Sequence, residues 1–465
     1  MTEAILADDA CGIADMARAL ASGRTSSEEL ARTALERIEQ HNPVLNAVIT
    51  VDADEVLETA VRADREIRDG RSRGPLHGIP IGIKDVIDIR GTRTSMGSTS
   101  CQDDIAARDA TVVSRLRQAG AIIVGKLNTQ EFAYGATGEA SFHGPTRNPH
   151  DPDRITGGSS GGPAAAVASG MCAGALGTDT GGSIRIPSAL CGVVGLKPTA
   201  GRISRAGVAT LSWTLDHVGP ITRSVADNAL MLSVLCGHDP LDAASARRHS
   251  EDFTRDLPKA VLGLRIGVAQ PYFANLDPRV RDGVEGALRI WEELGSTVRS
   301  VDIRGLDHVI TAQRTVLSVE AYAALRHRYE ERPLSFDPTV RQRLGHGSEV
   351  PGWQYAEARR SRHAATNAFD AALADVDVLV APMVPITAPL LGQHETTDAG
   401  APETVQSALT RLSGATNFTG HPSLTMPCHN AGHGLPVGVQ LIARRWDEAT
   451  LYRFGQALED AAPDH

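Results

Sequence analysis

Residues 157–188 read GGSSGGPAAAVASGMCAGALGTDTGGSIRIPS. Two glycine-rich clusters that contain serine flank a run of small apolar residues. In the second cluster Thr180, Gly181 and Gly182 come directly before Ser183, so consecutive backbone N–H groups can converge beside its hydroxyl without bulky side chains. A tetrahedral oxyanion requires donors in this arrangement. The stretch therefore indicates a serine nucleophile with an oxyanion hole.

The first cluster, GGSSG at 157–161, matches the GxSxG pattern of the nucleophile elbow, with Ser159 at its centre. That elbow needs a strand directly before it and an acid and a histidine after it. The preceding residues 148–156, NPHDPDRIT, predict turns instead of a strand. An α/β-hydrolase-type esterase with Ser159 as the nucleophile stays an alternative with weaker support.

A lysine offers a different base for the serine. In HGIPIGIKDV (77–86) isoleucine occupies every second position before Lys84, which predicts a strand that ends at this lysine. Ligands bind at the carboxyl ends of strands in α/β sheets, and a lysine desolvated there can be neutral and accept a proton. Lys84 is therefore a candidate base if Ser159 relays the proton between it and Ser183.

Strand and helix patterns alternate along the chain, which is typical of an α/β fold. TSSEELARTALERI (25–38) predicts a helix that opens with a capping box between Ser26 and Glu29. Residues 163–172 predict a second helix, with a proline in its first turn. A chain of 465 residues would usually form two or three domains, but a broad α/β sheet can absorb it as one.

The composition narrows the class of function. Of the residues, 42% are hydrophobic, and the net charge of -10 argues against nucleic acid or an anionic membrane as the main partner. Six scattered cysteines form no CxxC pair, no apolar run reaches 18 residues, and the N-terminus lacks the layout of a signal peptide. We expect a cytoplasmic protein with a small uncharged substrate and, in the absence of an HExxH motif, no metal.

Taken together, the motifs resemble the amidase signature family of serine hydrolases, whose signature residues 157–188 follow nearly without interruption. The supporting stretches are PLHGIPIGIKD (75–85), LDHVGPITRSVAD (215–227) and LPVGVQLIA (435–443). The resemblance implies a single large mixed β-sheet covered on both faces by helices, in one domain over 1–465. Its expected parts are an N-terminal helical segment (10–70), a signature core (74–230) and a variable substrate-pocket region (240–410).

The resemblance also implies roles for individual residues. Lys84 corresponds to the catalytic lysine, Ser159 to the bridging serine after a cis peptide bond, and Ser183 to the nucleophile. The backbone of residues 180–183, namely Thr180, Gly181, Gly182 and Ser183, corresponds to the oxyanion hole, and Asp179, Arg185 and Ser160 match positions that brace this loop. Phe132 and Tyr134, in QEFAYGATG (130–138), are candidates for apolar contacts with substrate. No cofactor or metal is required for this chemistry.

Two members of the family compete for the substrate assignment. In the A subunit of glutamyl-tRNA amidotransferase, which passes ammonia to a partner, an arginine in an EVKRR-like segment and an aspartate shortly before NxxGxP bind glutamine. Here the corresponding stretches are TVRQRLGHGSEV (339–350) and TRLSGATNFTGHP (410–422), with Thr410 where the acid would fall. We therefore predict a stand-alone hydrolase of a small-molecule amide, or of a carbamate, urea or ester, without nucleic acid or membrane partners; the resemblance favours a homodimer. The amidotransferase component is the alternative.

Overall fold

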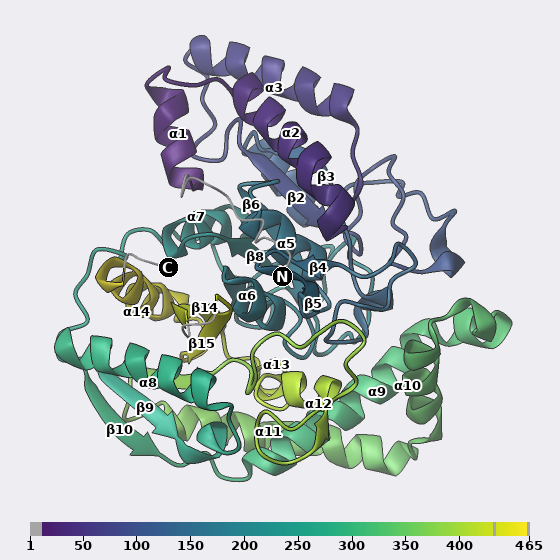
Figure 1. Ribbon diagram of the computed structural model, residues 1–465, viewed down its shortest axis with the longest axis vertical. Coiled ribbons are helices and arrows are strands. Elements are labelled where there is room, and N and C mark those ends of the chain that lie inside the picture. Colours follow the sequence, from purple (N-terminus) through teal and green to yellow (C-terminus); the bar gives the residue numbers. More distant parts are fainter. Residues whose placement is uncertain (1–11, 431–433, 463–465) are drawn as a thin grey trace.

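The computed structural model describes residues 12–430 and 434–462, and its centre is an 11-stranded sheet (Figure 1). Across the sheet the strands follow the order β1 (Val48–Thr50), β3 (Ile122–Leu127), β2 (Pro80–Lys84), β6 (Gly174–Asp179), β8 (His217–Thr222), β7 (Val194–Lys197), β14 (Ser423–Asn430), β15 (Pro436–Ile442), β11 (Val378–Pro382), β9 (Arg265–Ala269) and β10 (Thr297–Val301). Strand β2 runs parallel to β3 and β6, whereas β8 is antiparallel to β6 and β7. The sheet is therefore mixed, as predicted.

Fourteen α-helices within the described residues flank this sheet. They are α1 (Ile13–Ala21), α2 (Ser27–Leu45), α3 (Ala53–Arg68), α4 (Thr111–Gln118), α5 (Gly161–Ala168), α6 (Arg185–Cys191), α7 (Val225–Leu235), α8 (Pro278–Glu293), α9 (Leu306–Glu331), α10 (Pro338–Glu349), α11 (Gly352–Ala372), α12 (Val405–Thr410), α13 (Gly414–Thr419) and α14 (Glu448–Ala461). Two small sheets lie outside the main one, formed by β4 (Arg147–Asn148) with β5 (Asp151–Ile155) and by β12 (Glu395–Thr396) with β13 (Glu403–Thr404).

Helices cover both faces of the sheet. Ala175 and Leu176 are neighbours on β6, so their side chains point to opposite faces. Ala175 belongs to an apolar cluster with Ala164 and Ala165 of α5, whereas Leu176 belongs to a larger cluster that includes Ala229 of α7. The predicted α/β fold, with one large mixed sheet between layers of helices, is confirmed.

Two predicted helices are present with adjusted bounds. Helix α2 has Ser26 as its N-cap, with the hydroxyl accepting the N–H of Glu29, so the predicted capping box is confirmed. The helix predicted over 163–172 is α5, which begins two residues earlier and ends at Ala168. It stops there because Gly170 adopts a left-handed φ of +72°, which favours glycine after a helix end.

The segment before Ser159 differs from expectation. Residues 151–155, predicted as turns, form strand β5, which pairs with β4. This short pair stands apart from the main sheet, so turn-forming residues such as Pro152 are tolerated in it. The prediction of turns was wrong here, but β5 is not the central strand that a nucleophile elbow requires.

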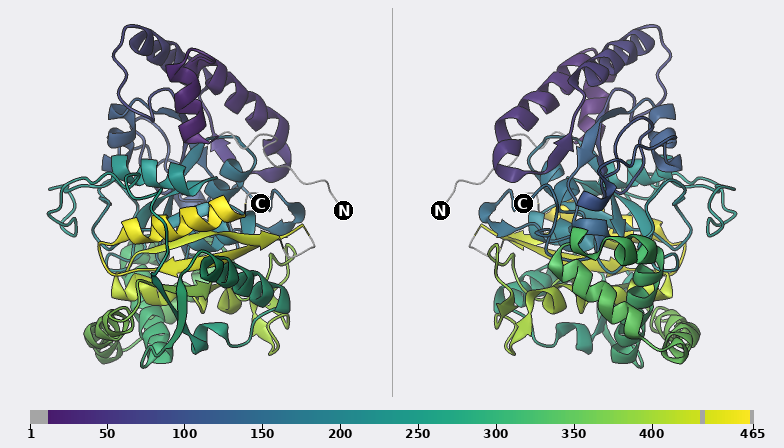
Figure 2. Two further views of the ribbon diagram at one scale, coloured as in Figure 1. Left: turned by 90° about the vertical axis from the view of Figure 1, so that its left-hand side faces the viewer. Right: turned by 90° about the vertical axis from the view of Figure 1, so that its right-hand side faces the viewer.

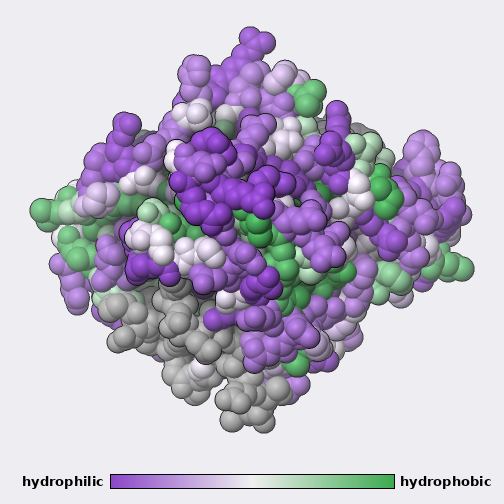
Figure 3. Space-filling view, turned by 90° about the horizontal axis from the view of Figure 1, so that it is seen from above, coloured by the Kyte–Doolittle hydropathy of each residue, from purple (hydrophilic) through white to green (hydrophobic). Residues whose placement is uncertain are grey.

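The side views show how the chain is distributed. Helices α1 to α3 lie at one end of the molecule, α9 to α11 lie at the other, and β14 and β15 lie between them (Figure 2). The end that carries α2 and α3 presents mainly hydrophilic side chains (Figure 3). Every helix in the described part of the chain is too short or too polar to span a lipid bilayer. The division into three segments and the cytoplasmic location stay predictions.

Candidate active site

Lys84 is the last residue of β2, and its side chain is fully buried. Because β2 and β6 are parallel, their carboxyl ends meet at one edge of the sheet. The ammonium nitrogen of Lys84 lies 2.7 Å from Ser159 Oγ, 2.9 Å from Ser160 Oγ and 2.8 Å from Thr178 Oγ1. Three oxygens satisfy the three donors of a charged lysine, whereas a neutral amine would donate to two and accept from the third.

Burial lowers the pKa of Lys84 to about 7, against the carboxylates of Asp179 and Asp216, which act to raise it. Lysine normally titrates far above neutral pH. Near pH 7, Lys84 is therefore neutral in a large fraction of the molecules and able to accept a proton.

Ser159 lies in the loop between β5 and α5, after a cis peptide bond with Gly158. Its carbonyl oxygen accepts hydrogen bonds from the N–H of Gln130 at 3.2 Å and from the hydroxyl of Thr129 at 3.1 Å. These two residues, which lie in another segment of the chain, hold the loop in place. Gly162 lets α5 approach closely, because a Cβ there would lie 2.4 Å from the carbonyl oxygen of Asn128. The small residues of the first glycine cluster thus hold Ser159 beside Lys84.

Ser183 follows β6 and precedes α6, and it retains 8% exposure. Its carbonyl oxygen accepts the N–H of Ser160 at 3.1 Å, which joins the two serine clusters. Its hydroxyl forms no hydrogen bond with any residue that the structure describes, including Ser159. The structure therefore brings Ser159 to Lys84 but does not form the last link of the predicted relay, a kind of contact that often tightens only when substrate binds.

The loop before Ser183 is shaped by Asp179. Its carboxylate accepts the N–H of Gly182 at 2.7 Å and the N–H of Ile184 at 3.1 Å. Gly182 has a φ of +125°, a conformation that requires glycine. The N–H of Gly182 is already used, whereas those of Thr180, Gly181 and Ser183 have no acceptor among the described residues and stay available to an oxyanion.

Asp179 also forms a fully buried ion pair with Arg185, 2.9 Å from Nε to Oδ2. Burial acts to raise the pKa of Asp179, but the guanidinium of Arg185 and the hydrogen bonds from Arg185 and Asn417 hold it below its usual range. The aspartate is therefore ionised, and its position is fixed by charge and hydrogen bonds.

Phe132 and Tyr134 are both buried. Phe132 stacks on Phe336 with 5.1 Å between ring centroids, and the guanidinium of Arg343 lies 5.8 Å from the ring centre of Tyr134. Their predicted contacts with substrate stay a prediction.

Several residues of the site were missed from the sequence or given a smaller role. Thr178 contacts the lysine although no motif singles it out; the signal was its position on β6, one residue before Asp179. Ser160, expected only to brace the loop, contacts Lys84 directly. Asp216 and Ser413 reach the 180–183 loop from distant segments, which no local pattern could show.

The elbow alternative gains no support from these contacts. Among the described residues no histidine forms a hydrogen bond with Ser159 or Ser183. The titratable side chain that contacts Ser159 is that of Lys84.

The comparisons with known proteins agree on the family. The family model Amidase matches residues 29–452. The A subunit of the glutamyl-tRNA(Gln) amidotransferase from Desulforapulum autotrophicum is 38% identical, over 96% of this chain and 96% of its own. A solved chain from a vestigial protein complex that reveals the evolutionary origins of an s-triazine catabolic enzyme is 35% identical, with a TM-score of 0.93 over 97% of this chain and 98% of that one. Native peptide amidase from Stenotrophomonas maltophilia is 33% identical, with a TM-score of 0.84 over 97% and 96%.

These findings correct one prediction. We expected a stand-alone hydrolase of a small molecule because Thr410 replaces an acid of the glutamine pocket, and we expected no nucleic-acid partner because the net charge is -10. Relatives that are 36–39% identical over nearly the whole chain are named as A subunits of the glutamyl-tRNA(Gln) amidotransferase, so this expectation is wrong. A single pocket position is weaker evidence than similarity that extends over 96% of both chains.

The family itself is established by a model that matches most of the chain and by relatives of more than 30% identity across it. The chain belongs to the amidase family, the amidase signature enzymes, and is a hydrolase of carbon–nitrogen bonds.

Proposed function

We propose that this chain is the amide-hydrolysing component of an amidotransferase of the glutamyl-tRNA(Gln) type, which releases ammonia from glutamine and passes it to a partner subunit. The observation that carries this proposal is the similarity to the amidase component of that enzyme, which extends over 96% of both chains. The similarity to a chain from a protein complex supports a partner.

The chemistry assigned to the site uses only its own side chains. Ser183 Oγ attacks the amide carbon while Ser159 takes its proton and passes its own proton to neutral Lys84. The oxyanion is stabilised by the N–H groups of Gly181 and Ser183. The proton returns through Ser159 to the leaving nitrogen, so ammonia departs and an acyl-enzyme remains on Ser183. Water, deprotonated by the same relay, then releases glutamate.

Arg343 is the candidate partner for the carboxylate of glutamine. It lies on α10, donates to the carbonyl oxygen of Tyr134 at 2.6 Å and donates to Gln406 Oε1 at 3.1 Å. It lines a cavity of about 250 Å³ together with Gln130 and Gln406. The two hydrogen bonds hold the guanidinium in place and leave further N–H donors for a carboxylate.

Thr410 is where the pocket departs from the family pattern. Its carbonyl oxygen accepts the hydroxyl of Ser413 at 3.2 Å, and the same hydroxyl contacts the carbonyl oxygen of Gly181. The backbone of Thr410 is therefore linked through the side chain of Ser413 to the loop that precedes Ser183, whereas the hydroxyl of Thr410 donates to the carbonyl oxygen of Gln406 at 2.9 Å. Without a carboxylate at this position, the ammonium of glutamine lacks an ion-pair partner there, and we expect weaker glutamine binding than an aspartate would give.

The test uses the whole assembly. A tagged copy of the chain is purified from the cells that make it, co-purifying chains are identified, and glutamine-dependent conversion of Glu-tRNA(Gln) to Gln-tRNA(Gln) is measured. We expect co-purifying partners and conversion, and we expect Ser183→Ala to abolish conversion while the same chains co-purify. Purified protein that neither hydrolyses glutamine nor forms Gln-tRNA(Gln) would overturn the proposal.

A further inference from the structure

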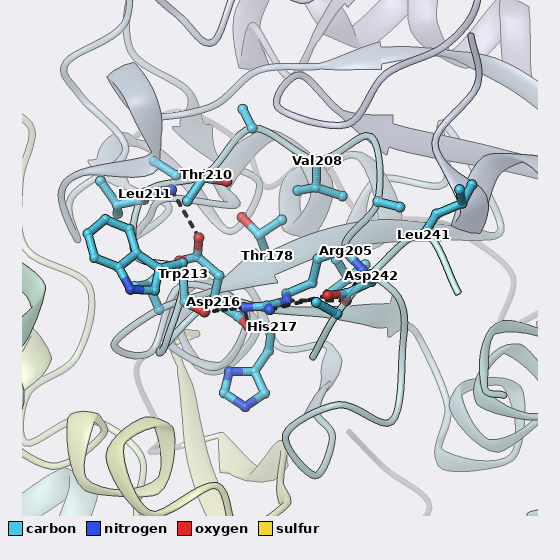
Figure 4. Close-up of a pocket in the computed structure, with 16 residues that line it drawn as sticks. Thr178, Arg205, Val208, Thr210, Leu211, Trp213, Asp216, His217, Leu241 and Asp242 are labelled. Carbon is cyan, nitrogen blue, oxygen red and sulfur yellow. Dashed lines mark hydrogen bonds and ion pairs between the residues drawn. The ribbon is translucent and has the colours of Figure 1, made fainter. Parts of the chain in front are cut away.

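A cavity of about 160 Å³ is lined in part by Thr178 of β6 and by Thr180, which come shortly before Ser183 in the chain (Figure 4). Arg205, Asp216 and Asp242 supply charged side chains to its lining, and Thr210 and His217 supply further polar groups. Thr178 is also the residue whose hydroxyl accepts a hydrogen bond from Lys84. The cavity therefore lies one side chain away from the proposed base.

Asp216 is held firmly in the wall of this cavity. Its Oδ2 accepts the backbone N–H groups of Leu211 and Ser212, each at 2.9 Å. Its own N–H donates to the carbonyl oxygen of Ser212 at 2.9 Å, which closes the turn before β8. With Oδ2 fixed in this way, Oδ1 accepts the hydroxyl of Thr180 at 2.7 Å. A carboxylate anchored by its own backbone turn thus anchors the loop opposite.

Each residue of the loop before Ser183 is fixed by a different part of the chain. The carbonyl oxygen of Thr180 accepts a hydrogen bond from Gln313 of α9 at 3.3 Å, and that of Gly181 accepts one from Ser413. The side chain of Thr180 has one hydrogen-bond partner among the described residues, Asp216. Loss of this contact would free the cavity side of the loop while the contacts on the other side stay.

The charge of Asp216 also acts on Lys84. Burial lowers the pKa of this lysine, and the carboxylates of Asp179 and Asp216 act in the opposite direction and raise it. Burial raises the pKa of Asp216 itself to about 6, while hydrogen bonds and Arg205 act to lower it, so it is largely ionised at pH 7.

The other charged groups around the cavity leave this effect in place. Arg205 is paired with Asp242, 3.4 Å from Nη2 to Oδ1. Burial, with the charge of Lys197, holds the pKa of His217 well below its usual range, so this histidine is neutral near pH 7.

We propose that Asp216 is a positioning residue of the active site. It fixes the loop of residues 180–183 through the hydroxyl of Thr180 and places a negative charge near Lys84. This inference rests on the proposed roles of Ser183 and Lys84 and assigns Asp216 no contact with substrate. Asp216 thus has two effects, a mechanical one on the loop through Thr180 and an electrostatic one on the pKa of Lys84. Different substitutions remove each of them.

The experiment measures the rate of covalent labelling of Ser183 by a fluorophosphonate between pH 5.5 and 8.5, because this probe needs no knowledge of the natural substrate. Asp216→Asn keeps an acceptor for the two backbone amides but removes the charge, so we expect the acidic limb of the profile to move down by about one pH unit. Thr180→Val removes the hydroxyl and keeps the charge, so we expect the plateau to fall about tenfold with the limb in place. Thr180→Ser should restore the plateau.

Asp242→Asn is the matched control, because it removes a carboxylate from the same cavity without a contact to Thr180; its profile should match the original. An unshifted limb in folded Asp216→Asn, or an equal shift in Asp242→Asn, would overturn the inference. If Asp216→Asn does not fold, an unchanged plateau in Thr180→Val overturns it. Failure of the original protein to be labelled at Ser183 would instead overturn the proposed function, so the two failures are distinguishable.

Discussion

Lys84 Nζ and Ser159 Oγ lie 2.7 Å apart although 75 positions separate the two residues in the chain. The end of β2 supplies the lysine, and the glycine-rich loop before α5 supplies the serine. Both are fully buried, so the proposed proton transfer between them would take place out of contact with bulk water. The following predictions test what this pair, the charges around it and the packing of α5 contribute.

The reaction should depend on pH through Lys84. Burial lowers the pKa of this lysine to about 7, and only the neutral form accepts a proton from Ser159. The value of kcat/KM should therefore rise as the pH increases through about 7 and fall tenfold per unit below it. Lys84→Arg, which stays protonated, should be inactive at every pH. A rising limb near the ordinary pKa of lysine would contradict the assignment.

An acid at position 410 should improve glutamine binding. Thr410→Asp introduces a carboxylate at the position where the family pattern has an acid, which would give the ammonium of glutamine an ion-pair partner. We expect KM for glutamine to fall about tenfold with kcat little changed. Thr410→Asn is the control, since it has nearly the same shape without the charge. Equal effects of both substitutions would show that charge at this position does not bind glutamine.

The buried ion pair between Asp179 and Arg185, beside the loop of residues 180–183, should be essential for stability. Arg185→Met leaves Asp179 charged, buried and without its partner, which should lower the free energy of unfolding by about 3–5 kcal/mol. Arg32→Met removes an exposed pair with Glu28 on α2 and should cost about 0.5 kcal/mol or less. Urea denaturation of both variants measures the difference, and similar midpoints would contradict this account of the loop.

Close approach of α5 should make Gly162 intolerant of a methyl group. A Cβ there meets backbone atoms of Asn128 and Ala47 within 2.7 Å, so Gly162→Ala should destabilise the protein by about 1–3 kcal/mol. Gly286→Ala, in α8, meets only the end of a flexible arginine and should stabilise by about 0.5–1 kcal/mol. Thermal melting of the two variants should shift in opposite directions. An unchanged or raised melting temperature for Gly162→Ala would show that α5 is not closely packed.

The parts of the site that could be predicted from the sequence are those encoded in short stretches. Alternating isoleucines placed Lys84 at the end of a strand, and the glycines before Ser183 indicated a loop of converging amides. Gly182 departs from the simple expectation, because the carboxylate of Asp179 takes its N–H. The glycine pattern alone does not show that a side chain accepts one of the backbone N–H groups of the loop.

Long-range contacts account for what could not be predicted. Asp216 reaches Thr180 across 36 positions and Ser413 reaches Gly181 across 232, and both contacts depend on how the sheet brings β6, β8 and α13 together. The prediction of a stand-alone protein, without partner subunits, was wrong for a different reason. Thr410 is one position in a loosely matching region, whereas the relation to the amidotransferase subunits extends over the full chain.

The central claim is that Ser183 is the nucleophile and Lys84 its base. Fluorophosphonate labelling of the purified protein, followed by peptide mapping, tests it most directly, with Lys84→Ala and the exposed Lys259→Ala treated in parallel. The account predicts label on Ser183 in the original protein and in Lys259→Ala, and loss of that label in Lys84→Ala. Label on Ser159, or undiminished labelling of Ser183 without Lys84, would contradict it.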